Sequence, residues 1–592
     1  MKNFLSWILL SLIILASFSL MFYSSRSESA IMDELAHIPA GYGYVKYLDY
    51  RLNPEHPPLV KALAALPLLF QSDINFPTDK DSWQTDINGQ WTAGTQFLYE
   101  SGNDADQIIK WSRFGPMILT LLLILLIYVW AKSLVGKNWA LLPALLFGLS
   151  PTVLAHGHYV TTDLGAAFGI FASTYFFIKY LFYSSRKNII WAGIFFGIAQ
   201  LLKFSAVLII PFFAFLVLAF AAWKAKNENN GGFWKILFKN ILSLILIFAI
   251  GYILVYIVYA VFTFNYPIEK QIFDTENTLS SFSSRTLADL NIKMASNNLT
   301  RPIAEYMLGV LMVMQRSSGG NTAYFLGKVS AGGWWYYFPV VFLLKEPLPS
   351  LILIALALLL VIWNVARKRH YTLHAFNDYL GTHFAEFSMI VFVIFYWLYS
   401  MKSPLNIGVR HILPTIPFIY ILLTGTLKKW SEKGSISSII KKASIFCLVL
   451  WFLAETLISA PFFISYFNQL GEGTENGYKY VTDSNYDWGQ DLKRLASWVE
   501  KNNIDKIAVN YFGGASVNYY IKDKAVDWQS SYGNPAKDGI QWFAVSINNL
   551  QNSVAETAPG FERSQKDEYS WLKNPYEPYA KAGTSIFIYK LY

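Results

Sequence analysis

The chain has 592 residues, of which 54% are hydrophobic and 17% aromatic, and this composition excludes a small soluble domain. A single cysteine, Cys447, excludes a disulfide framework and a cysteine-based metal site. The net charge of +9 does not indicate nucleic-acid binding, because the basic residues lie in short loops between apolar runs.

About eleven apolar runs along the chain can each cross a bilayer, which predicts a polytopic α-helical membrane protein. The first run could instead be a signal peptide cleaved after Ala30, but its length and the many runs that follow favour a retained span. The predicted spans are Phe4–Phe22, Phe114–Trp130, Trp139–Ala155, Asp163–Phe182, Ile189–Leu202, Ser205–Trp223, Ile236–Phe264, Pro349–Ala366, Glu386–Ser400, Val409–Leu427 and Ala443–Ile464.

Basic residues fall in alternate loops when the N-terminus is placed in the cytoplasm, as the positive-inside rule requires. Lys132, Lys137, Arg186 and Lys187 are examples. This pattern predicts a multi-pass protein of the cytoplasmic (inner) membrane, with residues 1–466 as the membrane domain. Residues 23–112 and 265–335 are then extracytoplasmic loops.

Residues 467–592 have a soluble composition and predict a small extracytoplasmic α/β domain. Short β-rich runs occur at Ile507–Phe512, Trp542–Ile547 and Thr584–Leu591. Before them, the acidic stretch DSNYDWGQDL at Asp483–Leu492 lacks the spacing of an EF-hand loop. We expect it to cap the helix that follows and to dock this domain on the membrane part, or else to contact an acceptor.

The first outer loop begins with a predicted amphipathic helix that carries an acidic pair and a histidine. Asp33 and His37 are one turn apart, and Glu34 lies three residues before His37, so all three can point into one cleft. The alternative is a helix that rests on the membrane surface with a solvated polar face.

A stiff polar corner, Asn53–Pro58 (NPEHPP), follows this helix and favours a functional site over a plain tether. The two prolines hold Glu55 and His56 at a bend, and Lys61 lies on the first helical turn beyond it.

Two further outer segments place polar groups at the start or end of a span. Asp163 follows two threonines and could be an ordinary helix start or a second acidic group of a site. His156 and His158, just before it, could be interfacial polar groups or metal ligands. Lys203 lies between two apolar runs, where a lysine either extends its amino group to the interface or binds an anion.

Arg410 and His411 open a span in the motif NIGVRHILP. Arginine offers a rigid and permanently charged fork for a phosphate, whereas the alternative role is an interfacial anchor.

These motifs resemble a known family. DELAH, GYGY, DYRLNPEHPPLVK, HGHYVTTD, LLKFS, NIGVRHILP and DSNYDWGQDLKRL are similar to segments of the GT-C fold glycosyltransferases that use polyprenyl-phosphate sugars. The group includes the protein O-mannosyltransferases and the lipid A aminoarabinose transferases. The predicted topology places every one of these segments on the outer side of the membrane, as one shared active site requires.

The resemblance implies transfer of a sugar from a polyprenyl-phosphate donor in the bilayer to an acceptor hydroxyl, with inversion. It implies that Asp33 is the general base and that Glu34, Glu55 and Asp163 position the acceptor or hold a divalent ion. The donor phosphate would be held by Lys61, Lys203, Arg410 and His411. The acceptor could be a protein serine or threonine, lipid A or another surface glycan.

A divalent metal ion is left open, because members of this fold differ in whether they use one. The possible ligands or positioning groups are Glu34, His37, Glu55, His56, His156, His158 and Asp163, and no spacing among them is diagnostic. His56 stands where the aminoarabinose transferases have a lysine.

Two other functions fit parts of the pattern. A secondary transporter would explain many spans and intramembrane charge, but it predicts an inverted repeat that the sequence does not show. An intramembrane metalloprotease could be built around Asp33, Glu34 and His37, but the zincin motif His-Glu-x-x-His is absent.

Overall fold

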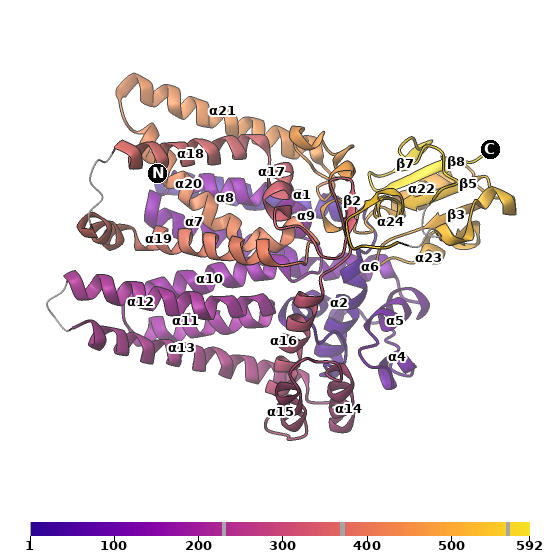
Figure 1. The fold of residues 1–592 in the computed structure, drawn as a ribbon, viewed down its shortest axis with the longest axis horizontal. Coiled ribbons are helices and arrows are strands. Elements are labelled where there is room, and N and C mark those ends of the chain that lie inside the picture. The colour runs from indigo at the N-terminus through magenta and orange to yellow at the C-terminus, as the bar shows by residue number, and fades with distance from the viewer. Residues whose placement is uncertain (1, 228–231, 368–372, 564–568) are drawn as a thin grey trace.

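The computed structural model describes residues 2–227, 232–367, 373–563 and 569–592. Long helices lie side by side along the longest dimension of the molecule, and a mixed sheet lies at one end (Figure 1). The helices are α1 (Lys2–Ser25), α2 (Met32–Tyr42), α3 (Leu59–Ala65), α4 (Asp81–Gln84), α5 (Gln90–Thr95), α6 (Ala105–Ser112), α7 (Phe114–Val135), α8 (Leu141–Gly148), α9 (Pro151–His156), α10 (Asp163–Phe182), α11 (Arg186–Leu202), α12 (Ile209–Asn227), α13 (Phe233–Phe262), α14 (Ile268–Thr278), α15 (Arg285–Ala295), α16 (Arg301–Gly319), α17 (Tyr337–Lys345), α18 (Leu348–Arg367), α19 (Leu373–Lys402), α20 (Ile416–Ser431), α21 (Ser435–Ser459), α22 (Leu492–Lys501), α23 (Val517–Ile521) and α24 (Ile547–Val554).

Within the described ranges, nine helical segments are long and apolar enough to cross a membrane, which confirms the predicted polytopic helical class. They are Phe4–Ser25, Ala105–Val135, Asp163–Phe182, Phe204–Asn227, Phe233–Phe262, Leu348–Arg367, Phe376–Lys402, Val409–Ser431 and Ile436–Ser459. The other two predicted spans coincide with shorter helices. One of them is interrupted at Leu149 and Ser150, between α8 and α9, and the other is α11, which has 17 residues.

Helix α11 extends as far as its neighbour α10, although it is short. Lys203, directly after α11, forms an ion pair with Asp163, the first residue of α10. Glycines allow the close packing that brings these helices together, since a Cβ on Gly169 would lie 2.8 Å from the Cα of Ala199. The start of α10 and the end of α11 therefore lie at the same level, which is where the site is built.

The C-terminal part forms a five-stranded sheet, in agreement with the predicted α/β domain. The strand order is β4-β3-β5-β8-β7, with β3 parallel to β4 and β5, and β8 antiparallel to β5 and β7. The strands are β3 (Ile507–Asn510), β4 (Ala525–Asp527), β5 (Trp542–Ser546), β7 (Ala580–Ala582) and β8 (Ile586–Lys590).

A second, three-stranded sheet joins this domain to the segment before α17. It has the order β1-β2-β6, in which β2 is parallel to β6. Its strands are β1 (Ala323–Phe325), β2 (Lys328–Ser330) and β6 (Glu556–Thr557).

The predicted docking stretch of the C-terminal domain lies against the segment between α1 and α2. The N–H of Ser29 donates to the carbonyl of Gln490 at 3.0 Å, and the N–H of Met32 donates to that of Trp488 at 3.0 Å. A Cβ on Gly514 would lie 2.2 Å from the carbonyl oxygen of Ile31, so only glycine fits this contact. The C-terminal domain thus holds the start of α2, where Asp33 lies.

Candidate active site

Four charged side chains from distant segments form a row of alternating positive and negative charges at the sheet end of the helices. Arg410 Nη1 lies 2.9 Å from Asp33 Oδ2 and 3.4 Å from Asp163 Oδ2. Lys203 Nζ lies 2.5 Å from Asp163 Oδ1. The order Asp33, Arg410, Asp163, Lys203 partly neutralises charges that would otherwise be costly to bury.

Each of these side chains is presented by the end of a helix. Asp33 is in the first turn of α2 and Asp163 is the first residue of α10, positions where the helix dipole stabilises a carboxylate. Lys203 follows α11 with an extended backbone, and Arg410 lies in the 3-10 turn Val409–Thr415 that leads into α20. Helix ends at one level therefore supply both signs of charge.

The four side chains differ in how far they reach solvent. The exposed fractions of the side chains are 24% for Asp33, 19% for Lys203, 9% for Arg410 and 2% for Asp163. Asp33 and Lys203 can therefore meet a substrate directly, whereas Asp163 is enclosed between the two cations. Arg410 Nε is buried and has no hydrogen-bond partner within the described residues.

His37 and His56 lie edge to face beside this row of charges, with ring centroids 5.0 Å apart. His37 Nδ1 lies 2.6 Å from the carbonyl oxygen of Val160, which can only accept, so Nδ1 carries the proton in this contact. Burial lowers the pKa of His37. Burial, followed by the charges of His37 and Lys61, lowers the pKa of His56 well below its ordinary value. Both rings are therefore neutral near pH 7, which leaves Nε2 of His37 as an acceptor.

His156 and His411 both lie near Asp163 and Arg410. Burial is the main cause that lowers the pKa of His156 to about 3, and its Nδ1 has no hydrogen-bond partner among the described residues. The partly exposed ring of His411 stacks on Phe338 with a centroid distance of 6.1 Å.

The structure corrects the prediction for Glu34, which does not point into the same cleft as Asp33. Its carboxylate is fully buried and accepts hydrogen bonds from Arg113 Nε at 2.9 Å and Arg113 Nη2 at 2.7 Å. It also accepts from the N–H of Val160 at 3.2 Å and from that of Ile31 at 3.1 Å. Glu34 therefore joins α2 to α7 and has no lone pair directed at a substrate.

The structure also corrects the prediction that Lys61 binds the donor phosphate. Its amino group is fully buried and donates to Tyr44 Oη, to the carbonyl and side-chain oxygens of Asn53, and to the carbonyl of His56, at 2.7 to 2.8 Å. Burial lowers the pKa of Lys61 well below its usual value. Lys61 thus holds the corner at residues 53–58.

Glu55, in the same corner, accepts hydrogen bonds from Asn88 Nδ2 at 3.0 Å and Gln90 Nε2 at 2.6 Å. These contacts join two parts of the first outer loop. Glu55 therefore stabilises the corner, and its carboxylate bonds Asn88 and Gln90 rather than a group at Asp33.

His158 is likewise engaged away from the cluster. Its Nε2 lies 2.8 Å from Glu28 Oε2, and its Nδ1 lies 2.8 Å from the carbonyl of Leu154. Burial would raise the pKa of Glu28, but His158 and Arg113 outweigh it and lower this pKa to about 2. Both ring nitrogens of His158 are occupied, so of the two roles left open for it, polar group or metal ligand, the structure favours the polar group.

The suggested metal ligands do not converge. Within the described residues, no three histidine, cysteine, aspartate or glutamate side chains are grouped so that they could share a metal ion. Asp33 and Asp163 meet on Arg410 instead, and Glu34 meets Arg113. The residues present therefore do not fit a metal centre, and no step below passes through one.

Sequence reasoning missed Arg113, Trp488 and Asp483. Arg113 directly precedes an apolar run and resembled an ordinary flanking charge. Trp488 covers Arg410, with the guanidinium carbon 4.1 Å from the ring centroid. Burial raises the pKa of Asp483 to about 6, and the charge of Arg410 opposes this rise. The motif DSNYDWGQDL was the available signal for the last two residues.

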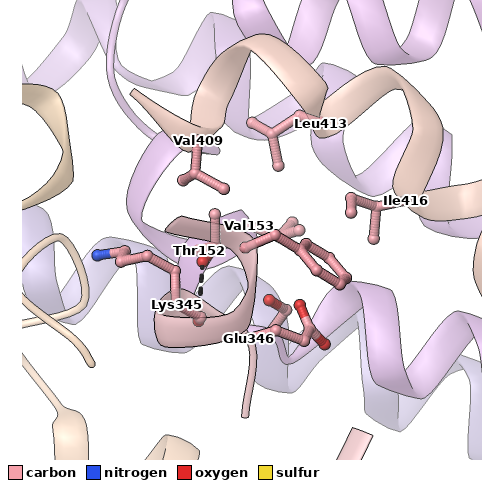
Figure 2. A pocket seen from close by; sticks show the side chains of 9 residues that line it. Thr152, Val153, Lys345, Glu346, Val409, Leu413 and Ile416 are labelled. Atoms are coloured by element: carbon pink, nitrogen blue, oxygen red, sulfur yellow. Dashed lines mark hydrogen bonds between the residues drawn. The ribbon is translucent and has the colours of Figure 1, made fainter. Parts of the chain in front are cut away.

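A small cavity lies directly behind the turn that carries Arg410 (Figure 2). Val409, Leu413 and Ile416 line it on one side and Thr152 and Val153 on another, while the amino group of Lys345 points away from it. Its volume of about 10 Å³ holds about one water molecule, so it cannot accept a sugar.

Comparison with known families supports the resemblance seen in the motifs. The family model for dolichyl-phosphate-mannose-protein mannosyltransferases matches residues 109–253. This range runs from α6 into α13 and contains Asp163 and Lys203. The similarity to glycosyltransferases of this group is thereby confirmed. No curated protein matches the sequence.

Several solved structures are similar in fold at low sequence identity. The oligosaccharyltransferase of Archaeoglobus fulgidus in the apo form is 13% identical, with 94% of this chain and 72% of that chain covered and a TM-score of 0.49. ArnT from Cupriavidus metallidurans bound to undecaprenyl phosphate is 13% identical, with 91% and 93% covered and a TM-score of 0.45.

The S. cerevisiae protein O-mannosyltransferase Pmt1–Pmt2 complex bound to the sugar donor is 18% identical. Its alignment covers 44% of this chain, with a TM-score of 0.31. This chain spans only 34% of the length of the yeast chain.

Proposed function

We propose that this protein transfers a sugar from a polyprenyl-phosphate donor to an acceptor hydroxyl at the outer face of the cytoplasmic membrane. The observation that carries the proposal is the row of alternating charges formed by Asp33, Arg410, Asp163 and Lys203 at the ends of the helices. A lipid phosphate at the membrane surface would meet two cations there, and a carboxylate lies next to them. The family match at residues 109–253 supports the same class of reaction.

In this proposal Arg410 and Lys203 bind the donor phosphate. Arg410 uses Nη1 for its two carboxylates, while its buried Nε has no hydrogen-bond partner within the described residues. A phosphate oxygen could accept from such a donor in a partly dehydrated setting, where a charged hydrogen bond is strong. The same cations would stabilise the negative charge that gathers on the phosphate as the bond to the sugar breaks.

Asp33 is the proposed general base. Its side chain is 24% exposed, against 2% for that of Asp163, so an acceptor hydroxyl can approach it. Asp33 would take the proton of that hydroxyl while the oxygen attacks the anomeric carbon from the face opposite the phosphate. The sugar would be transferred with inversion, and polyprenyl phosphate would leave. Asp163 would hold Arg410 and Lys203 in position.

The orientation and the location are part of the proposal. The outer placement of the site follows from the basic loops and requires an N-terminus in the cytoplasm and a C-terminal domain on the outer side. A sugar lipid presented on the outer leaflet would then meet the site without crossing the bilayer again.

The test is consumption of labelled polyprenyl-phosphate hexoses and pentoses by membranes that carry wild type or Asp33→Asn, with released polyprenyl phosphate as the readout. Asp33-dependent release from one donor would support the proposal and identify the sugar. A folded wild-type protein that consumes no donor of a broad panel would contradict it, and transport assays would follow.

The acceptor requires a separate comparison of surface proteins, lipid A and glycans from a deletion strain. A sugar mass missing from proteins alone would identify a protein O-glycosyltransferase. Unchanged proteins with an altered lipid or glycan would point to the other acceptors.

A further inference from the structure

Trp488 of the C-terminal domain contacts Arg410 and the residue that precedes Asp33. Its ring covers the guanidinium of Arg410 at 4.1 Å, measured from Cζ to the ring centroid. Its carbonyl oxygen accepts a hydrogen bond from the N–H of Met32, the residue before Asp33, at 3.0 Å. Trp488 is 1% exposed, so both contacts are shielded from water.

The backbone around Trp488 is held by the sheet domain. The N–H of Trp488 donates to Gln490 Oε1 at 2.9 Å, and Asp487 Oδ2 accepts from the N–H of Asn548 at 3.0 Å. Gly489 has a φ of 96°, and a Cβ there would lie 2.3 Å from the Cα of Gly513. The position of the indole is therefore determined by the C-terminal domain.

The same stretch also holds the backbone on both sides of Gly408, two residues before Arg410. The N–H of Val409 donates to Asn485 Oδ1 at 2.9 Å, and the hydroxyl of Ser484 donates to the carbonyl of Ile407. Asp483, which begins the stretch, adopts a φ of 55°, a strained value for a residue other than glycine. Such strain persists only where surrounding contacts impose it.

We propose that residues 483–491 form one wall of the active site and that Trp488 is a positioning residue for Arg410 and Asp33. This inference rests on the proposed function. The indole face attracts the guanidinium and prevents it from turning away when a donor phosphate competes with Asp33. The carbonyl of Trp488 keeps the start of α2 at the distance at which Asp33 meets that arginine. The C-terminal domain thereby takes part in binding the donor.

The first test compares Trp488→Phe and Trp488→Leu with the matched pair Trp528→Phe and Trp528→Leu. Trp528 is another buried tryptophan of the C-terminal domain, 5% exposed, and its indole N–H donates to the carbonyl of Gly533 at 2.9 Å. For Trp488→Leu we expect the donor KM to rise about tenfold or more, because the cation–π contact is lost, while Trp488→Phe restores most of the affinity. The Trp528 variants should lower thermal stability without changing the donor KM.

A double-mutant cycle with Arg410→Lys separates positioning from general loss of structure. Lysine lacks the planar group that stacks on the indole, so Trp488→Leu should change the donor KM much less in the Arg410→Lys background. Equal effects of Trp488→Leu in both backgrounds would overturn the inference, as would a donor KM within about twofold of wild type for Trp488→Leu.

Peptide-resolved hydrogen exchange tests the same inference without turnover, so failure of the proposed function would not leave it undecided. We expect Trp488→Leu to increase amide exchange in residues 29–38 and 406–413, and Trp528→Leu to leave both segments unchanged. Unchanged exchange in these segments for Trp488→Leu would show that Trp488 positions neither one, whatever the enzyme consumes.

Discussion

Asp33 and Arg410 are 377 positions apart in the sequence, and their side chains meet at 2.9 Å. The carboxylate is the better exposed partner, whereas the guanidinium is mostly buried and also contacts Asp163. A phosphate that binds Arg410 therefore competes with Asp33 for the same guanidinium group. Donor binding would release Asp33 to accept a proton, which couples the two halves of the proposed reaction.

Asp33→Asn should lower kcat for donor consumption by about 10²- to 10⁴-fold, the range typical of a lost general base. The donor KM should stay the same or fall, because an uncharged side chain competes less for Arg410. Turnover and KM with the labelled donor measure both effects. Asp79→Asn is the control, since Asp79 is in the same outer loop and its side chain is 76% exposed. A raised donor KM with unchanged kcat would assign Asp33 to binding.

Arg410→Lys should show the opposite pattern, with a donor KM raised about 10- to 100-fold. Lysine keeps the charge but cannot give several parallel donors, and charged hydrogen bonds contribute about 1.5–3 kcal/mol each. Binding of polyprenyl phosphate alone should weaken by a similar factor. The control is Arg285→Lys, at an exposed arginine that pairs with Asp289 on α15. Unchanged donor affinity in Arg410→Lys would remove the arginine from the phosphate site.

Much of the fold could be predicted because it depends on local patterns. Apolar runs identified the spans, and the strand predictions at Ile507–Phe512 and Trp542–Ile547 overlap β3 and β5. Two predicted spans differ from the structure: one is divided into α8 and α9, and the other, α11, is short. An average of hydropathy over a window detects neither the break nor the exact length.

The site was harder to predict, because the direction of each side chain depends on distant partners. Neighbours on a helix point about 100° apart, so Asp33 and Glu34 can either share a wide cleft or face different partners. Which of them turns inward is decided by Arg113, 79 positions after Glu34. Lys61 looked like a phosphate ligand because its partners are not visible in the sequence. Three of its four acceptors belong to the folded corner at residues 53–58, and the fourth is Tyr44 Oη.

Glu34→Gln should destabilise the fold and should not act through the chemical step. Breaking a buried ion pair by removing one partner costs about 3–5 kcal/mol, and here it leaves the charged Arg113 with only its longer ion pair to Glu28, at 3.9 Å. Thermal unfolding in detergent measures this loss. The control is Asp289→Asn, which breaks an exposed pair whose contribution is about 0.5 kcal/mol or less. A stable Glu34→Gln protein with strongly reduced kcat would instead show that Glu34 acts in catalysis.

The Glu28–His158 pair predicts how stability depends on pH. The pKa of Glu28 is lowered from 4.5 to about 2, since His158 and Arg113 outweigh the effect of burial. A carboxylate with a lowered pKa stabilises the fold above its unfolded-state pKa, and this contribution is lost as the pH falls toward the folded-state value. The shift corresponds to about 3 kcal/mol at neutral pH.

Glu28→Gln should therefore be less stable than wild type by about that amount at pH 7, and the difference should shrink as the pH falls from about 4.5 toward about 2. Unfolding in detergent across this range measures it, with the exposed Glu276→Gln as control, and a difference that stays constant with pH would contradict the assignment.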